Sequence, residues 1–190
     1  LAISVNAQQI TQPALGSHDQ SFIYKNGLKF RDLNHDGKLN EYEDWRLSSV
    51  ERAADLMHRM TLAEKAGLMM HGTAPVKGSV IGSGAVYDRD ASQKMMLEAH
   101  VTSLLTRLNG DDPALLATQN NLLQEIAESG RLGIPVTVST DPRNSYQDLV
   151  GISNPAGKFS QWPEAIGIGA AGSESLARDY AAHIREEYRA

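Results

Sequence analysis

Along residues 48–190, short apolar runs alternate with segments that carry helix start signals, and this alternation constrains the fold more than any other feature of the sequence. The helix starts include the capping box Thr61–Glu64 and Asp112 placed before Pro113. The expected strands are 80–86, 101–105, 134–138 and 165–171, and the expected helices are 48–60, one beginning at 61, 91–99, 112–129 and one beginning at 173. Strands and helices that take turns form βαβ units around a parallel sheet. We therefore expect an α/β protein.

The number of these units indicates how much of a fold the sequence holds. Alternation alone does not distinguish a barrel from a doubly wound sheet, but four units are about half of an eightfold barrel, which takes ~250 residues. The sequence ends at residues 186–190, inside a helical pattern and without a capping residue. We expect the first half of a (β/α)8 TIM-type barrel, incomplete at its C-terminus and belonging to a longer polypeptide.

Residues 32–43, DLNHDGKLNEYE, have the spacing of an EF-hand calcium loop. Oxygen-bearing side chains fall at positions 1, 3, 5, 9 and 12 of this loop, with glycine at position 6 and leucine at position 8. Calcium takes six to eight oxygen ligands, the glycine permits a sharp turn, and a glutamate at the last position supplies two oxygens. The predicted ligands are Asp32, Asn34, Asp36, the carbonyl of Lys38 and Glu43, with Asn40 binding directly or through water.

The loop occurs once and follows no clear helical pattern, so we expect a structural Ca²⁺ ion rather than a paired sensor. An acidic surface turn is the alternative interpretation. No organic cofactor is expected.

The first seven residues, LAISVNA, are similar to the end of a secretory signal, with small side chains at Val5 and Ala7 before a polar stretch. We therefore expect an exported protein, periplasmic or secreted. The expected organisation is a signal remnant and linker over 1–20, the calcium loop segment over 21–47 and the barrel portion over 48–190.

Composition excludes several classes of partner and site. A net charge of −5 and a pI near 5.7 argue against nucleic acid. No run of apolar residues approaches the ~18 that a membrane span needs. The sequence has no cysteine, which excludes disulfides, thiolate metal sites and a cysteine nucleophile.

Asp141 and Arg143 are the candidate ligand-binding residues. Asp141 follows the expected strand 134–138, and ligands of parallel α/β folds gather at the carboxyl ends of the strands. Spacing alone fits equally a turn aspartate before Pro142. Trp162 suits stacking on a sugar ring or, more simply, packing in the core.

Four stretches give the sequence a family resemblance. Residues 51–65, ERAADLMHRMTLAEK, resemble the opening of glycoside hydrolase family 3, the β-glucosidase family. Three further stretches agree with this family in order and spacing: 121–125 (NLLQE), 131–135 (RLGIP) with the following Asp141, and 162–167 (WPEAIG). The resemblance covers about residues 48–190. It implies a (β/α)8-type catalytic domain followed by an α/β sandwich domain, and retaining hydrolysis of β-linked sugars. It also implies that Asp141 binds hydroxyls of the terminal sugar.

The resemblance places the catalytic machinery elsewhere. The nucleophilic aspartate, the acid/base glutamate and a Lys-His pair of the family are expected beyond residue 190, and retaining hydrolysis needs two carboxyl groups ~5–5.5 Å apart. This chain is therefore expected to hold no catalytic residue. The sequence departs from the family in having no arginine between 171 and Arg178, so Arg143 is the candidate to grip the sugar instead.

The expected function is that of an exo-acting retaining β-glycosidase, β-glucosidase-like, of which this chain is the N-terminal part. Its expected partners are a carbohydrate substrate and the remainder of the same polypeptide. A β-xylosidase or β-N-acetylhexosaminidase of the same family is an alternative. A further alternative is a non-catalytic, calcium-dependent module similar to dockerins, although a dockerin needs a second loop copy and this sequence holds one.

Overall fold

The computed structural model describes residues 11–79, 83–141, 144–145 and 156–189. The chain divides into two compact units. The first comprises Leu1–Met60 with Arg131–Gly133, and the second comprises Thr61–Gly130 with Ile134–Ala190.

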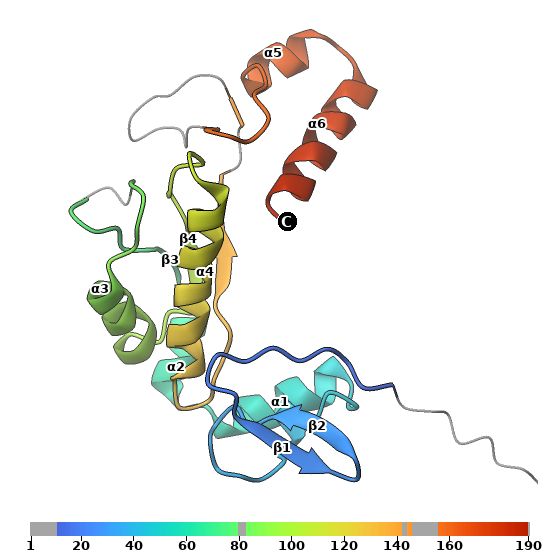
Figure 1. The fold of residues 1–190 in the computed structure, drawn as a ribbon, viewed down its shortest axis with the longest axis vertical. Helices are drawn as coiled ribbons and strands as arrows, with labels where there is room; N and C mark the ends of the chain where they lie inside the picture. Colours follow the sequence, from blue (N-terminus) through green and yellow to red (C-terminus); the bar gives the residue numbers. More distant parts are fainter. Residues whose placement is uncertain (1–10, 80–82, 142–143, 146–155, 190) are drawn as a thin grey trace, which may run out of the picture. The chain divides into compact units, whose positions relative to one another are not determined.

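The first unit begins with a β-hairpin (Figure 1). Strands β1 (Phe22–Lys25) and β2 (Leu28–Arg31) pair antiparallel around a two-residue Asn26–Gly27 turn, a combination that matches the twist of paired strands. Phe30 of β2 is fully buried and stacks on Trp45, with ring centroids 5.4 Å apart. The indole Nε1 donates to the Lys29 carbonyl at 2.9 Å, which fixes the segment after the loop against the hairpin.

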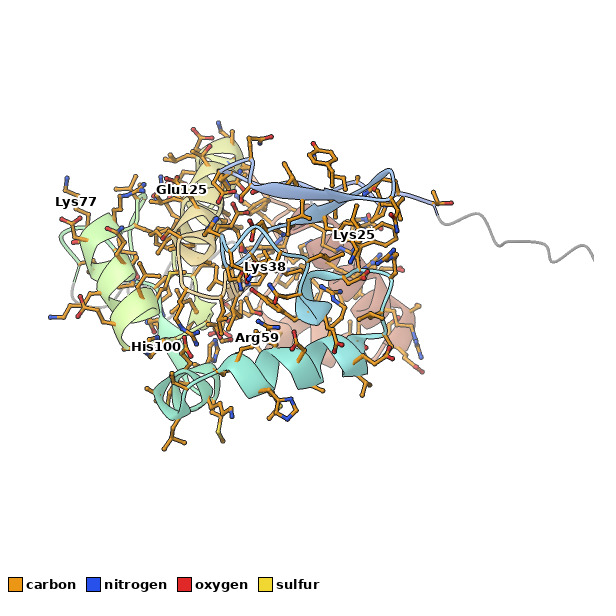
Figure 2. The ribbon with its side chains drawn as sticks, turned by 90° about the horizontal axis from the view of Figure 1, so that it is seen from below. Lys25, Lys38, Arg59, Lys77, His100 and Glu125 are labelled. Carbon is orange, nitrogen blue, oxygen red and sulfur yellow. The ribbon has the colours of Figure 1, made fainter. Side chains whose placement is uncertain are left out.

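A short 3₁₀ helix, η1 (Glu41–Glu43), follows the loop, and helix α1 (Ser49–Arg59) follows η1. Ser48 and Glu51 form the reciprocal capping box at the start of α1, as the sequence predicts. All side chains of α1 are half-buried or exposed. In Figure 2, Lys38 lies on the loop and Arg59 near the end of this helix. Polar contacts rather than apolar burial therefore attach α1 to its unit.

The second unit contains a parallel sheet of order β3-β4-β5, with Gly72, Leu104 and Val138 aligned across it. Its elements are α2 (Leu62–Leu68), β3 (His71–Thr73), α3 (Arg89–Gln93), the π-helical turn η2 (Lys94–Glu98), β4 (Ser103–Leu105), α4 (Pro113–Glu128), β5 (Thr137–Ser139), α5 (Ala165–Ala170) and α6 (Glu174–Glu187). Helix α4 connects β4 to β5 in the sequence and runs alongside the sheet (Figure 1). The parallel sheet confirms the α/β expectation.

The core of this unit forms where α4 meets the sheet. It is a cluster of buried apolar side chains that includes Leu104, Leu116, Leu123 and Ile126. Asp112 caps α4 through the N–H groups of Ala114 and Leu115, as its place before Pro113 predicts. The Gln124 amide donates to the Val136 carbonyl at 2.8 Å, tying the helix to the approach to β5.

The predicted strand 165–171 is wrong: these residues form helix α5. The N–H groups of Gly167 and Ile168 both bond to the Glu164 carbonyl, so the chain coils from the residue after Pro163. Ile168 is buried whereas Ile166 is 84% exposed, which is the one-sided burial of a surface helix. A short apolar run does not by itself distinguish a strand from a helix, and here the prediction chose the strand.

The other predicted strands differ in place or extent. Residues 80–82 of the predicted strand 80–86 lie outside the described residues, and Gly84 forms only an isolated bridge with Leu108. The strand actually present before α3 is β3, whose residues His-Gly-Thr carry no apolar signal. The predicted strands 101–105 and 134–138 correspond to the shorter β4 and β5. The predicted helix 91–99 is α3 continued by η2.

None of the helices in the described part of the chain is both long enough and apolar enough to cross a membrane.

Candidate functional site

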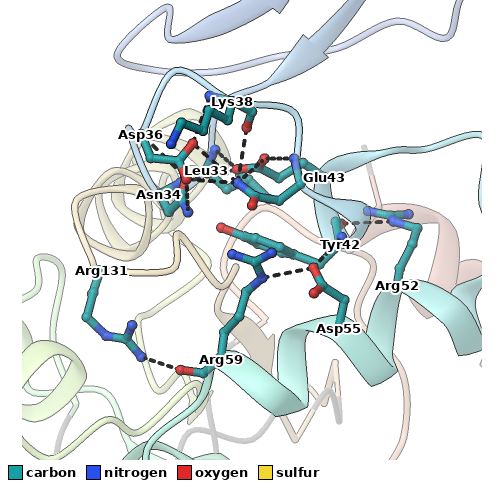
Figure 3. A network of polar contacts seen from close by, with 11 residues as sticks. Leu33, Asn34, Asp36, Lys38, Tyr42, Glu43, Arg52, Asp55, Arg59 and Arg131 are labelled. Carbon is teal, nitrogen blue, oxygen red and sulfur yellow. Dashed lines mark hydrogen bonds and ion pairs between the residues drawn. The ribbon is translucent and has the colours of Figure 1, made fainter.

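The loop of residues 32–43 is closed by two buried carboxylates at its ends. Asp32 accepts from the N–H of Asp36 at 3.1 Å and of Gly37 at 3.0 Å. Glu43, 3% exposed, accepts from the N–H of Leu33 at 2.8 Å (Figure 3). Gly37 has φ +70°, a conformation that favours glycine at this sharp turn. These contacts bring the first and last positions of the predicted loop together.

The side chain of Asn40 lies in the middle of the loop oxygens. Its Nδ2 is 3.3 and 3.2 Å from the two carboxylate oxygens of Asp36, 3.0 Å from the Lys38 carbonyl and 3.1 Å from Glu43 Oε2. The Asn40 amide is also the main reason that the pKa of Asp36 is lowered. Oxygens of three of the five predicted ligands, Asp36, Lys38 and Glu43, therefore surround an amide. No group of three or more His, Cys, Asp or Glu side chains in the described residues gathers so as to hold a metal ion.

Tyr42 lies beneath the loop and is 4% exposed. Burial, followed by the nearby carboxylate of Glu43, raises its pKa well above the usual range. Within the described part of the chain, its Oη has no hydrogen-bond partner. Buried phenols usually have one.

A chain of polar contacts connects the loop to α1 (Figure 3). The Tyr42 N–H donates to Asp55 at 3.1 Å, and the same carboxylate accepts from Arg59 Nε at 2.9 Å. The Tyr42 carbonyl accepts from Arg52 at 3.0 Å, and the Arg59 carbonyl accepts from Arg131 at 3.0 Å. The loop is thus anchored to the helix through backbone groups.

Residues 131–133 pack directly against the loop. A Cβ added to Gly133 would lie 2.5 Å from the Leu33 carbonyl oxygen, and its φ of +54° also favours glycine. The close approach leaves room for no larger residue there.

The second candidate site lies after β5, at the carboxyl end of the parallel sheet. Thr73, Leu105 and Ser139 share the last register position of the three strands, and Asp141 follows two residues later. The Asp141 side chain is exposed. Arg143 lies outside the described residues. His71 Nε2 and Ser139 Oγ are 2.7 Å apart, a contact that connects β3 to β5 and that the sequence did not indicate.

Asn144, three residues after Asp141, is 1% exposed and has φ +43°. Its Nδ2 donates to Glu187 Oε2 at 2.5 Å, and the same carboxylate accepts from the N–H and the hydroxyl of Ser160 at 2.7 and 2.9 Å. The Asn144 carbonyl accepts from the Trp162 N–H at 2.7 Å. Two distant segments, residues 160–162 and the end of α6, therefore hold the chain just beyond Asp141. Sequence reasoning missed this cluster because no local pattern links residues 43 positions apart.

Trp162 is half-buried and packs on α6. Its ring centroid is 5.4 Å from that of Tyr180 and 5.7 Å from that of His183, and its Nε1 donates to Ser160 at 2.9 Å. These contacts favour the packing role over stacking on a sugar.

Comparison with curated proteins gives relatives of one kind. The chain is 56% identical over all 190 residues to a periplasmic β-glucosidase/β-xylosidase of Dickeya chrysanthemi, of which it covers 29%. It is 39% identical over 148 residues to a probable β-glucosidase C of Aspergillus oryzae, covering 23% of it, and 38% identical over 143 residues to β-glucosidase C of Emericella nidulans, covering 22%. No protein-family model matches the chain.

The chain spans less than a third of the length of these relatives. Similarity that extends along all of its 190 residues nevertheless confirms the resemblance drawn from four short stretches. The chain is therefore β-glucosidase-like and corresponds to an N-terminal portion of a glycoside hydrolase family 3 protein.

Proposed function

We propose that this chain forms the sugar-binding start of the catalytic domain in an exo-acting, retaining β-glycosidase that removes terminal β-linked sugars. The observation that carries the proposal is the 56% identity, over the whole chain, to a β-glucosidase/β-xylosidase. Because that relative is named for both activities, β-xyloside hydrolysis is the second candidate, ahead of β-N-acetylhexosaminidase and of a dockerin-like module.

The β3-β4-β5 sheet would be the first part of a (β/α)8 barrel over residues 48–190. Three parallel strands with α4 between β4 and β5 are compatible with that fold. The remaining strands and the α/β sandwich domain would come from the rest of the same polypeptide. The proposed compartment is the periplasm or the exterior of the cell, as the name of the Dickeya relative suggests.

Asp141 would bind the terminal sugar. It lies beyond the carboxyl end of β5, where substrates of barrel enzymes bind, and its exposed carboxylate offers only acceptor sites. A sugar presents several O–H donors, so the two are complementary. Arg143, two residues later, would add a cationic donor to the same ring. The nucleophile and the acid/base that break the glycosidic bond would come from outside this chain.

The test compares variants of the complete enzyme on aryl β-glucosides and aryl β-xylosides. Asp141→Asn should lower kcat/KM at least ~10-fold, because hydrogen bonds to a charged group contribute ~1.5–3 kcal/mol and each 1.36 kcal/mol of barrier is one decade. Asp179→Asn, an exposed aspartate of α6, is the matched control and should leave kcat/KM unchanged. A normal rate with a lowered melting temperature in Asp141→Asn would make Asp141 a turn residue only. Absence of turnover on both substrates by the complete wild-type enzyme would overturn the proposed activity.

A further inference from the structure

We propose that the loop between β2 and η1 binds one Ca²⁺ ion, and that the ion displaces the Asn40 amide from the oxygens that now surround it. The ligands would be Asp32, Asn34, Asp36, the Lys38 carbonyl and Glu43, with Asn40 Oδ1 turned towards the ion directly or through water. This inference is independent of the proposed glycosidase activity.

Four acceptor oxygens of the loop surround a single amide nitrogen, Asn40 Nδ2. An amide NH₂ group has two hydrogens, yet four oxygens lie 3.0–3.3 Å from Asn40 Nδ2. Two of these oxygens belong to Asp36 and one to Glu43, so the group carries more negative charge than an amide can offset. A divalent cation satisfies several oxygens at once, and Ca–O distances of about 2.3–2.6 Å would need these four oxygens to move inward by roughly 0.4–1 Å.

A buried phenol lies beneath the loop. Tyr42 is 4% exposed, its Oη has no hydrogen-bond partner among the described residues, and its ring is drawn under the loop ligands in Figure 3. Water bound to the ion would give the phenol the partner that the loop residues do not supply. This observation is separate from the spacing of the acidic residues.

The oxygen ligands of the loop suit Ca²⁺ better than Mg²⁺. The loop offers side-chain and carbonyl oxygens and a final glutamate able to supply two oxygens, which suits the six to eight ligands of Ca²⁺. Mg²⁺ requires a smaller octahedral shell and loses its waters reluctantly. The Asn40 amide nitrogen lies between oxygens of Asp36, Lys38 and Glu43, so an ion that binds these oxygens must displace it. The proposal therefore predicts a specific side-chain rearrangement.

Binding would stabilise the first unit, because a ligand that binds only the folded form shifts the folding equilibrium. The loop reaches α1 through Tyr42, whose N–H bonds to Asp55 and whose carbonyl bonds to Arg52. Hydrogen exchange in α1 should therefore slow when the ion is added, although no predicted ligand belongs to that helix.

The test is calorimetric titration of the complete, chelator-treated protein with CaCl₂ and, separately, MgCl₂. We expect one Ca²⁺ per chain and much weaker Mg²⁺ binding. Glu43→Gln should weaken Ca²⁺ binding at least ~10-fold. Glu41→Gln removes the same charge from an exposed position of η1 and should bind like the wild type.

Asn40→Asp is a variant for which the proposal predicts a gain of Ca²⁺ binding, a result that a folding defect could not produce. It removes the amide donor and adds an oxygen ligand, so it should bind Ca²⁺ more tightly than the wild type. Absence of Ca²⁺ binding by the wild type, equal weakening in Glu43→Gln and Glu41→Gln, or weaker binding by Asn40→Asp would each overturn the proposal and leave the loop an acidic turn.

Discussion

The hydrogen bonds that close the loop and tie it to α1 join residues nearer in the sequence than the hydrogen bonds around Asp141 do, although residues 131–133 also pack against the loop. In the loop, Asp32 and Gly37 are 5 positions apart, and the contact to α1 joins Tyr42 and Asp55, 13 apart. Beyond Asp141, Asn144 and Glu187 are 43 apart, and His71 and Ser139 are 68 apart. Closing a longer loop costs more chain entropy, so the second region needs a packed core to hold it.

The units also differ in what stabilises them. Helix α1 is attached to its unit by hydrogen bonds, and all of its side chains are half-buried or exposed. The second unit has a cluster of buried apolar side chains between α4 and the sheet. Apolar burial is insensitive to pH and to modest salt, whereas contacts between charged groups are sensitive to both. The first unit should therefore respond to changes in pH and salt, whereas the second should respond to changes in apolar packing.

The largest expected effect is in the apolar core. Leu104 of β4 is fully buried, and Leu104→Ala should destabilise the second unit by about 2–5 kcal/mol through lost burial and a cavity. Hydrogen exchange of α4 peptides in the complete protein measures this loss. Leu62→Ala, at a position 84% exposed, is the control and should change stability by less than about 0.5 kcal/mol. Similar losses in both variants would remove the contrast between the units.

A smaller effect is expected where distant segments meet. Glu187→Gln replaces a charged acceptor of three hydrogen bonds, and it should destabilise the segment around Asn144 by about 1.5–3 kcal/mol. Hydrogen exchange of peptides containing Ser160 reports the change. Glu186→Gln, at the exposed neighbouring position, should have no such effect. If the two variants behave alike, the carboxylate of Glu187 is not what holds this segment.

The features best predicted from the sequence are those formed by residues close together in the chain. Caps at Ser48, Thr61 and Asp112 are confirmed, because each side chain bonds to an N–H only two or three residues away. The bounds of α1 and α4 agree with the predicted helices to within one or two residues. The calcium ligands and the sugar contacts of Asp141 and Arg143 remain predictions.

What the sequence could not predict depends on tertiary context. β3 has no apolar alternation, and it is a strand because it pairs with β4. Residues 165–170 have an apolar run that fits either a strand or a helix, and in the structure they form a helix that buries Ile168. The contacts of Glu187 with Asn144 and Ser160 exist only once α6 has packed.

The smallest predicted effect concerns the polar attachment of α1 and depends on pH. Burial by itself would raise the pKa of Asp55, but hydrogen bonds from Arg59 and from the Tyr42 N–H outweigh burial and lower it. A carboxyl group whose pKa is lower in the folded state stabilises the fold above its unfolded pKa of ~3.9, and this contribution is lost as pH falls through the folded pKa. The free energy of unfolding of the wild type should therefore be about 1 kcal/mol higher than that of Asp55→Asn near pH 7.

This difference between wild type and Asp55→Asn, measured by hydrogen exchange of α1 peptides, should shrink as the pH falls below ~3.9 and approach zero below the folded pKa. A double-mutant cycle with Arg59→Gln assigns the cause, since the 2.9 Å contact between the two side chains should produce a coupling energy near pH 7 that added salt reduces. Leu104→Ala is the comparison variant, because the stability that it loses should stay constant over the same pH range. A pH-independent effect of Asp55→Asn, with no coupling to Arg59, would show that α1 is held by packing after all and that the two units are stabilised alike.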